Sequence, residues 1–373
     1  RILSYLSAGH HAGLPDWESD RTGNAALSIR LANDTLLTSA MLAAIPVDIL
    51  QQPFPMEKPT GRDAAFWIRM LFSCLVDADF LDTEEFFQPE QTALRGSYST
   101  LSALRIRFET YMKAKIQDAK KTHSLVNKIR ADIYHQCVKA AADNPGLFSL
   151  TVPTGGGKTL SSMAFALQHA HHHGHKRIIY VIPYTSIVEQ TADQFRKIFG
   201  EVVIEHHSNL DVADEARETP QSRLACENWD APIIVTTNVQ FFESLFASRT
   251  SSCRKLHNIV NSIVILDEAQ LLPPDYLNPI LKALDELRKN YGATILFSTA
   301  TQPAFGKQQD LKEFKGLEGI REIMPDPKKL YSQLKRVEVH IPKNISEPCT
   351  WESLAEEMAG YPYDCDSPRG IPG

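Results

Sequence analysis

Short apolar runs alternate with amphipathic stretches over most of the chain from about residue 123 onward. The amphipathic stretches repeat their apolar positions every three or four residues, which is the period of a helix with one buried face. The short runs are rich in Val, Ile and Leu, and they predict strands buried on both faces. The candidate strands are Leu147–Val152, Arg177–Ile182, Val202–His206, Ile233–Thr237, Ile263–Leu266 and Thr294–Ser298. Helices between successive strands predict an α/β fold with a parallel sheet.

Before residue 123 the pattern is mostly helical. Large apolar residues recur at helical spacing in Asp63–Asp79, and Thr100–Lys121 is a charged amphipathic stretch with few turn signals. We therefore expect a helical first part, then a connecting helix, then the parallel sheet.

Composition and charge restrict the classes of function. The 373 residues are 43% hydrophobic and 23% charged, which is ordinary for a globular protein with enough chain for two cores. The net charge of −6 predicts no general basic surface, so a nucleic acid would have to be held by helix ends and hydroxyl groups. No apolar run reaches the roughly 18 residues of a membrane span. The six cysteines are scattered, so we expect a reduced, cytoplasmic setting and no membrane partner.

The segment Thr151–Thr159, TVPTGGGKT, follows the first strand and precedes a helical pattern. Its glycines leave backbone N–H groups free to surround phosphates, and the helix directs its positive end to the same place. Lys158 would neutralise phosphate charge, and Thr159 would offer its hydroxyl to Mg²⁺. The expected contacts with ATP and Mg²⁺ are Thr154, Gly155, Gly156, Gly157, Lys158 and Thr159.

Two acidic residues follow the strand Ile263–Leu266 directly. Asp267 is placed to hold Mg²⁺ through its water shell, and Glu268 is placed to orient an attacking water. Together with the glycine loop, the pair predicts hydrolysis of the nucleotide.

The next strand ends in the polar sequence FSTATQP, Phe297–Pro303. The Pro-Thr-Gly-x-Gly-Lys-Thr form of the loop, the Asp-Glu-Ala-Gln tetrad and this segment resemble motifs of superfamily 2 helicases. The resemblance implies that Gln270 contacts the nucleotide. It also implies that Ser298, Thr299 and Thr301 couple the nucleotide site to a nucleic-acid track.

Two further strands open into helices whose first residues are polar. Hydroxyl groups and free N–H groups at a helix start suit phosphate oxygens, so we expect contacts with a DNA backbone. Plain N-capping is the alternative interpretation, and both can hold. The residues concerned are Tyr184, Thr185, Ser186, Thr236, Thr237 and Asn238.

The N-terminal sequence GHHAGLPDW contains the adjacent residues His10 and His11. Imidazoles and carboxylates are the ligands of hydrolytic metal sites. Asp77 and Asp79 emerge from an otherwise apolar helix, where a carboxylate needs a partner that a metal would provide.

Nearly the whole chain resembles the type I CRISPR-associated helicase-nucleases, in which an HD-type nuclease precedes two RecA-like lobes. GHHAG and Ala78-Asp79-Phe80 resemble two metal-binding motifs of that nuclease, which implies ligand roles for His10, His11 and Asp79, with Asp77 as the alternative. The resemblance also implies a transition metal (Mn²⁺, Fe²⁺, Co²⁺ or Ni²⁺), single-stranded DNA as substrate and a crRNA-guided, Cascade-type surveillance complex as partner.

This resemblance divides the chain into a partial all-helical HD-type nuclease domain (1–95), a connecting helix (96–122), a first RecA-like lobe (123–320) and a connector with a disordered tail (321–373). The family's earlier histidines and its second lobe, with the arginine that completes ATP hydrolysis, have no counterpart here. We therefore expect a fragment truncated at both ends, and its own activity stays open.

Other interpretations also stay open. The chain is alternatively a lobe of another superfamily 2 DNA or RNA helicase, or an inactive ATP- or DNA-binding remnant. The histidine run His169–His175 is expected to form the exposed last turn of the helix after the loop, in preference to a metal tract. No ligand role is expected for His206 or His207. The candidates for adenine recognition are Asn127, Arg130 and Gln136.

Overall fold

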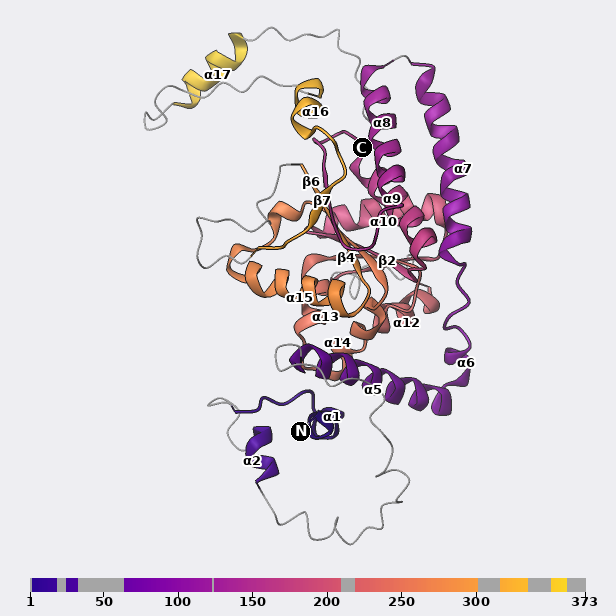
Figure 1. The fold of residues 1–373 in the computed structure, drawn as a ribbon, viewed down its shortest axis with the longest axis vertical. Coiled ribbons are helices and arrows are strands. Elements are labelled where there is room, and N and C mark those ends of the chain that lie inside the picture. The colour runs from indigo at the N-terminus through magenta and orange to yellow at the C-terminus, as the bar shows by residue number, and fades with distance from the viewer. Residues whose placement is uncertain are drawn as a thin grey trace. The chain divides into compact units, whose positions relative to one another are not determined.

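The predicted strands assemble into one parallel sheet (Figure 1). The computed structural model describes residues 2–18, 25–32, 64–122, 124–208, 219–300, 316–334 and 350–360. Among these, the sheet has seven strands in the order β3-β4-β2-β5-β6-β1-β7. The strands are β1 (Leu147–Thr151), β2 (Arg177–Ile182), β3 (Val203–His206), β4 (Ile233–Thr237), β5 (Ser262–Leu266), β6 (Thr294–Thr299) and β7 (Ile320–Glu322). This confirms the predicted α/β class with a RecA-like parallel sheet.

Successive residues of each strand point to opposite faces of the sheet, so each strand contributes to two cores. Phe148, Tyr180 and Ile265 belong to one core, whereas Ile179 and Phe297 belong to the other. The first core is covered by α7 (Leu101–Lys120), α8 (Leu125–Ala140), α9 (Lys158–His173) and α10 (Thr185–Phe199). The second is covered by α12 (Pro220–Asn228), α13 (Asn238–Phe246) and α15 (Leu277–Asn290).

The strand order decides which loops meet. All strands are parallel, so their carboxyl ends lie at one edge of the sheet. β6 pairs with β1 on one side and with β5 on the other. The glycine loop after β1, the acidic pair after β5 and the polar segment after β6 therefore come together.

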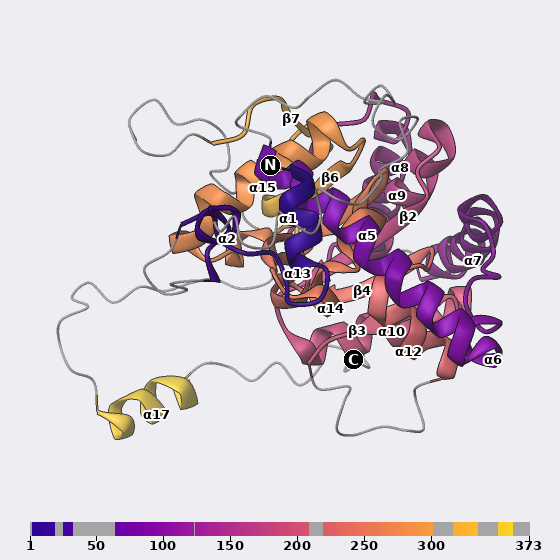
Figure 2. The same cartoon turned by 90° about the horizontal axis from the view of Figure 1, so that it is seen from below.

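Before the sheet, the described residues form helices: α1 (Ile2–Gly9), α2 (Leu27–Leu31), α5 (Ala64–Phe87) and α6 (Pro89–Thr92). α5 packs against α14 (Thr250–Cys253) and η3 (Leu256–Ile259), the turns that lead into β5. Figure 2 shows α5 and α1 side by side. Phe72 and Val76 on α5 are buried against Cys253, so this helix has its own small core with the lobe.

The remaining elements are short. They are η4 (Ala269–Leu271), η5 (Pro274–Tyr276), α16 (Pro327–Gln333) and α17 (Trp351–Gly360). The chain divides into one unit of residues 1–334 and a second of residues 335–373, which contains α17. None of the described helices is long and apolar enough to cross a membrane. The expected boundaries at 95, 122 and 320 stay predictions.

Candidate functional site

The glycine loop has the backbone that its sequence predicts. Gly155 and Gly157 have φ angles of 81° and 84°, in the region that favours glycine. A Cβ on Gly156 would lie 2.4 Å from Cγ1 of Val152, so a larger residue would displace the loop. Gly157 is the N-cap of α9, and the first N–H groups of this helix are therefore available beside the loop.

Lys158 lies at the first position of α9, and only 9% of its surface is exposed. Its Nζ donates to Oε1 of Glu268 at 2.6 Å, and Nε2 of Gln270 donates to Oε2 of the same carboxylate at 2.6 Å. Glu268 has a left-handed backbone, with φ 47° and ψ 46°, which turns the chain sharply after β5. The sharp turn and the two donors together hold the Glu268 carboxylate beside the glycine loop.

The other acidic residue is buried deeper. Oδ1 of Asp267 accepts a hydrogen bond from Oγ of Ser298 at 2.7 Å, and Oδ2 accepts one from the hydroxyl of Tyr180 at 3.2 Å. Burial raises the pKa of Asp267, and the Ser298 bond and the charge of Lys158 oppose this effect. A divalent cation would offset the same burial, so Asp267 fits a Mg²⁺ site.

The polar residues after β6 join this network. Oγ1 of Thr299 donates to Oε1 of Gln270 at 2.7 Å, and the N–H of Val152 donates to the carbonyl of Thr299 at 3.1 Å. The structure thus brings together predicted residues from all three motifs. Thr301 lies outside the described residues.

Two contacts of this site were not assigned from the sequence. Tyr180 lies inside β2, where an aromatic residue in an apolar run predicts only core, yet its hydroxyl contacts Asp267. Nε of Arg130, one of the adenine candidates, donates to the carbonyl of Gly155 at 2.9 Å. Another adenine candidate, Asn127, bonds to Thr122 within the connection between α7 and α8.

The residues expected at a DNA backbone fall into two groups. At the start of α10, Tyr184 is 54% exposed, Ser186 is exposed and Thr185 is half-buried. No side-chain bond caps this helix within the described residues, so its first N–H groups remain available to a ligand.

The second group, at the start of α13, is less accessible. Thr237 is the N-cap, and its hydroxyl accepts from the N–H of Gln240 at 3.2 Å. Thr236 is fully buried and donates to the carbonyl of His206 at 2.8 Å, so the structure does not present this hydroxyl for the expected DNA contact. Asn238 is half-buried.

The three expected nuclease ligands are not gathered into one site. His10 is half-buried and its Nδ1 lies 2.7 Å from the carbonyl of Ser7, while His11 and Asp79 are exposed. The rings of His10 and His11 are tilted by 43° to each other, with centroids 3.9 Å apart. In the described part of the chain, no three His, Cys, Asp or Glu residues form a group that could hold a metal ion. The ligand roles of His10, His11 and Asp79 stay a prediction.

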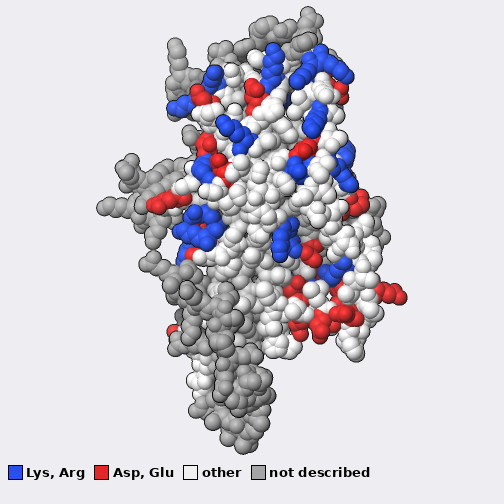
Figure 3. Space-filling view, turned by 45° about the vertical axis from the view of Figure 1, so that its right-hand side comes forward, with Lys and Arg blue, Asp and Glu red and all other residues white. Residues whose placement is uncertain are grey.

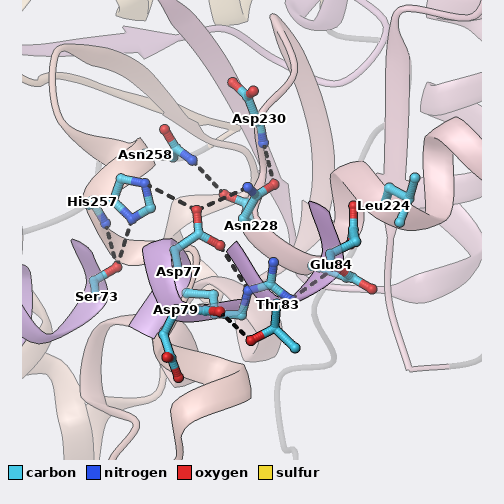
Figure 4. A network of polar contacts seen from close by, with 12 residues as sticks. Ser73, Asp77, Asp79, Thr83, Glu84, Leu224, Asn228, Asp230, His257 and Asn258 are labelled. Atoms are coloured by element: carbon cyan, nitrogen blue, oxygen red, sulfur yellow. Dashed lines mark hydrogen bonds and ion pairs between the residues drawn. The ribbon is translucent and has the colours of Figure 1, made fainter. Parts of the chain in front are cut away.

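Asp77, the alternative ligand, contacts polar groups of the protein (Figure 4). It is buried on α5, and its Oδ1 accepts from Nε of Arg254 at 2.8 Å. Its Oδ2 accepts from Nδ2 of Asn228 at 3.1 Å and lies 3.6 Å from Nε2 of His257. The partner that this buried carboxylate requires is therefore the arginine that follows α14.

The expected position of the histidine run was wrong for two of its members. His169 and His175 are buried, and both lie within hydrogen-bond distance of Oγ1 of Thr294, at 3.0 and 3.4 Å. Nδ1 of His169 also lies 2.9 Å from the carbonyl of Ala141. Burial lowers the pKa of His169 to about 3 and that of His175 to about 4. His171 and His172 are exposed, as expected for a helix end.

Comparisons with known proteins agree with the motifs. Residues 131–309 match the family model for DEAD/DEAH box helicases. A relative from Haloferax volcanii, named CRISPR-associated nuclease/helicase Cas3, is 31% identical over 196 residues. That match covers 46% of this chain and 21% of the relative, so the chain spans about a fifth of the relative's length.

Similar solved structures include T. fusca Cas3 with ADP, with a TM-score of 0.49, 19% identity, and coverage of 80% of this chain and 37% of that one. The T. fusca Cas3 structure with AMPPNP gives a TM-score of 0.48 and 19% identity, covering 81% of this chain and 36% of that one. The Pyrococcus furiosus Hef helicase domain gives 0.36 and 20% identity, covering 52% and 36%. The sheet order and the glycine loop define the fold independently of these structures. The residues that match the DEAD/DEAH box helicase model include the glycine loop and the acidic pair.

Proposed function

We propose that this chain carries the ATP-hydrolysing lobe of a single-stranded DNA translocase that acts in type I CRISPR interference. One observation carries the proposal: a continuous set of hydrogen bonds joins Lys158 to Glu268, Gln270 and Thr299. Glycine loops and acidic pairs occur separately in many folds. A shared network between them is what coupling of nucleotide hydrolysis to movement requires.

The residues present fit Mg²⁺ and ATP. The hydroxyl of Thr159 and the carboxylate of Asp267 are oxygen donors of the kind that Mg²⁺ prefers. When bound, Mg²⁺ neutralises part of the phosphate charge. Lys158 would leave Glu268 for the phosphates, and the released carboxylate would then orient the attacking water. The ion pair in the structure is therefore the resting arrangement of two groups whose partners change when nucleotide binds.

The start of α10 supports a DNA track at the same edge of the sheet. The exposed Tyr184 offers a ring for stacking with a base, and Ser186 offers a hydroxyl to a phosphate. On the face drawn in Figure 3, Lys and Arg side chains are mixed with Asp and Glu. DNA binding at the start of α10 would depend on helix ends, hydroxyl groups and stacking more than on a basic surface.

The nuclease part of the proposal rests on motifs alone. The sequence motifs at His10, His11 and Asp79 support metal-dependent cleavage of DNA, with a transition metal as cofactor. The name of the Haloferax relative includes both nuclease and helicase. A crRNA-guided surveillance complex is the proposed partner that delivers the displaced DNA strand.

The test of the motor is Mg²⁺-dependent ATP turnover of the chain, with and without single-stranded DNA. Turnover that DNA stimulates and that Lys158→Ala abolishes would support the proposal. Turnover that survives in Lys158→Ala would contradict it, since the reaction would then not use this site. Lys176→Ala, at an exposed lysine before β2, is the matched control and should not change the rate.

Metal-dependent cleavage is tested separately with Mn²⁺ and single-stranded DNA. Loss of cleavage in His11→Ala and Asp79→Ala, with ATP turnover unchanged, would support the nuclease assignment. Cleavage that persists in both variants would contradict it.

A further inference from the structure

Glu322 lies at the base of the glycine loop, and none of the motifs discussed above includes it. It is the last residue of β7, the edge strand that pairs with β1. The pairing covers three residues and ends at Ser149 opposite Glu322, and the N–H of Ile323 then donates to the carbonyl of Ser149 at 2.8 Å. β1 continues for two more residues, to Thr151, beyond this last pair.

Beyond the end of β7, the Glu322 side chain makes the hydrogen bonds to β1. Oε1 accepts from the backbone N–H of Thr151 at 3.1 Å, and Oε2 accepts from the hydroxyl of the same residue at 2.7 Å. The hydroxyl of Ser149 donates to Oε2 at 2.8 Å, and the N–H of Met324 donates to Oε1 at 3.0 Å. A single carboxylate thus satisfies the edge of β1 up to the last residue before the glycine loop. Hydrogen bonds to an ionised acceptor are about twice as strong as neutral ones.

The opposite edge of Thr151 faces the catalytic network. Thr151 pairs with Thr299 of β6, and Thr299 in turn donates to Gln270, which holds Glu268. The N–H of Val152, the next residue, donates to the carbonyl of Thr299 at 3.1 Å, so hydrogen bonds and one backbone step connect Glu322 to the carboxylate that pairs with Lys158. Thr151 and Thr299 are both fully buried, so water cannot replace these bonds.

The chain after Glu322 returns to the same loop. Leu334, which follows α16, is buried, and its Cδ1 lies 3.4 Å from where a Cβ on Gly156 would be. Burial and the charge of Glu268 raise the pKa of Tyr331, so this α16 residue lies within electrostatic reach of the catalytic carboxylate. The segment 320–334 therefore bonds to the end of β1 through Glu322 and lies against the loop through Leu334.

From these contacts we infer that Glu322 is a positioning residue for ATP. It fixes the end of β1 and thereby the position of the glycine loop that follows. The position of the loop then depends on where the 320–334 segment lies. This inference rests on the proposed nucleotide function and adds a residue that acts through Thr151 without touching the nucleotide.

The test is the affinity of the chain for Mg·ATP, measured by calorimetric titration. Glu322→Gln keeps the volume of the side chain but turns one acceptor into an NH₂ group that faces donors. We expect its Kd to rise about tenfold, the loss of roughly one charge-assisted bond. Ser149→Ala is the matched control: it removes a donor to the same carboxylate two residues below the loop, and its Kd should stay within about twofold of wild type.

Thr151→Val gives a second, milder perturbation that keeps the backbone bond. We expect it to raise the Kd, and we expect Glu322→Gln to cost less affinity in the Thr151→Val background than alone, since both changes affect the same bond. A purely structural role would instead lower the unfolding temperature of Ser149→Ala and Glu322→Gln alike and leave both affinities unchanged.

The two proposals fail in different ways. Glu322→Gln and Thr151→Val that fold and bind Mg·ATP like wild type, while Lys158→Ala does not bind, would overturn the positioning role alone. A wild-type chain without Lys158-dependent binding would overturn the proposed function and this inference with it.

Discussion

Asp267 is buried, although the proposed Mg²⁺ site requires its carboxylate to be charged. Burial raises its pKa, because a charged carboxylate inside the protein loses its water. Among the described residues, its carboxylate accepts hydrogen bonds from the hydroxyl groups of Ser298 and Tyr180 and from the backbone N–H of Glu268. Functional groups held in this way reduce stability, and removing the charge recovers it.

Asp267→Asn should therefore stabilise the chain while abolishing ATP turnover. We expect the free energy of unfolding to rise by about 1 kcal/mol, because the amide has no charge to desolvate and Tyr180 can reverse its hydrogen bond. Urea denaturation without nucleotide and Mg²⁺ measures this change. A loss of stability would show that the carboxylate is well compensated in the fold and is no strained Mg²⁺ ligand.

The sequence motifs predicted which groups share the edge of the sheet, but not all of their contacts. Lys158 and Glu268 could be predicted to meet, because loops at the carboxyl ends of parallel strands share an edge. Tyr180 and Glu322 could not be predicted. The first lies in an apolar strand that indicates only core, and the second acts through a strand too short to show a pattern.

Among the elements, α5 carries Asp77 and Asp79, whose carboxylates lie in opposite environments. Asp77 is buried against Arg254, and Asp79, two residues on, is exposed. Asp77→Ala should lower the free energy of unfolding by about 3 kcal/mol, because buried Arg254 loses one of its two carboxylate partners and keeps only the half-exposed Glu227 among the described residues.

Asp79→Ala is the control on the same helix and should change stability by no more than about 0.5 kcal/mol. Both values come from urea denaturation. Equal effects of the two changes would contradict the structural role given to the Asp77–Arg254 pair.

The end of α9 makes the lobe sensitive to acid. His169 and His175 have pKa values near 3 and 4 in the folded chain, below the ordinary value of 6.5. The unfolded chain therefore takes up protons first as pH falls, and stability present above pH 6.5 is lost between about 6.5 and 3. We expect the two histidines to reduce the free energy of unfolding by roughly 4 kcal/mol between pH 7 and 5.

Denaturation curves at several pH values measure this slope. His169→Gln should flatten it, although the variant starts from a lower stability, whereas the exposed His172→Gln should leave it unchanged. An unchanged slope in His169→Gln would mean that other groups cause the acid sensitivity.

Strands with several β-branched residues were predictable, and six of the seven described ones lie where the apolar runs indicated. β7 has only three residues, so its place in the sheet depends on the partner strand and not on its own pattern. The histidine run was misjudged because only some of its positions face Thr294, and a run of identical residues hides the helical period.

For the whole molecule, the described residues of the first unit place the glycine loop, the acidic pair and the polar end of β6 at one edge of the sheet. α5, which precedes the sheet, is bonded through Asp77 to Arg254, while Leu334 of the 320–334 segment lies beside the glycine loop. The parallel sheet was predicted from the alternation of elements. The contacts that attach the segments before and after the sheet were not predicted, because they join residues far apart in sequence.

We propose that the edge formed by β1, β5 and β6 binds ATP with Mg²⁺. Calorimetric titration of the wild-type chain with Mg·ATP, beside Lys158→Ala and the control Lys176→Ala, tests it most directly. We predict one binding site in the wild type and in Lys176→Ala, and none in Lys158→Ala. Equal binding by all three proteins, or none by the wild type, would contradict the account.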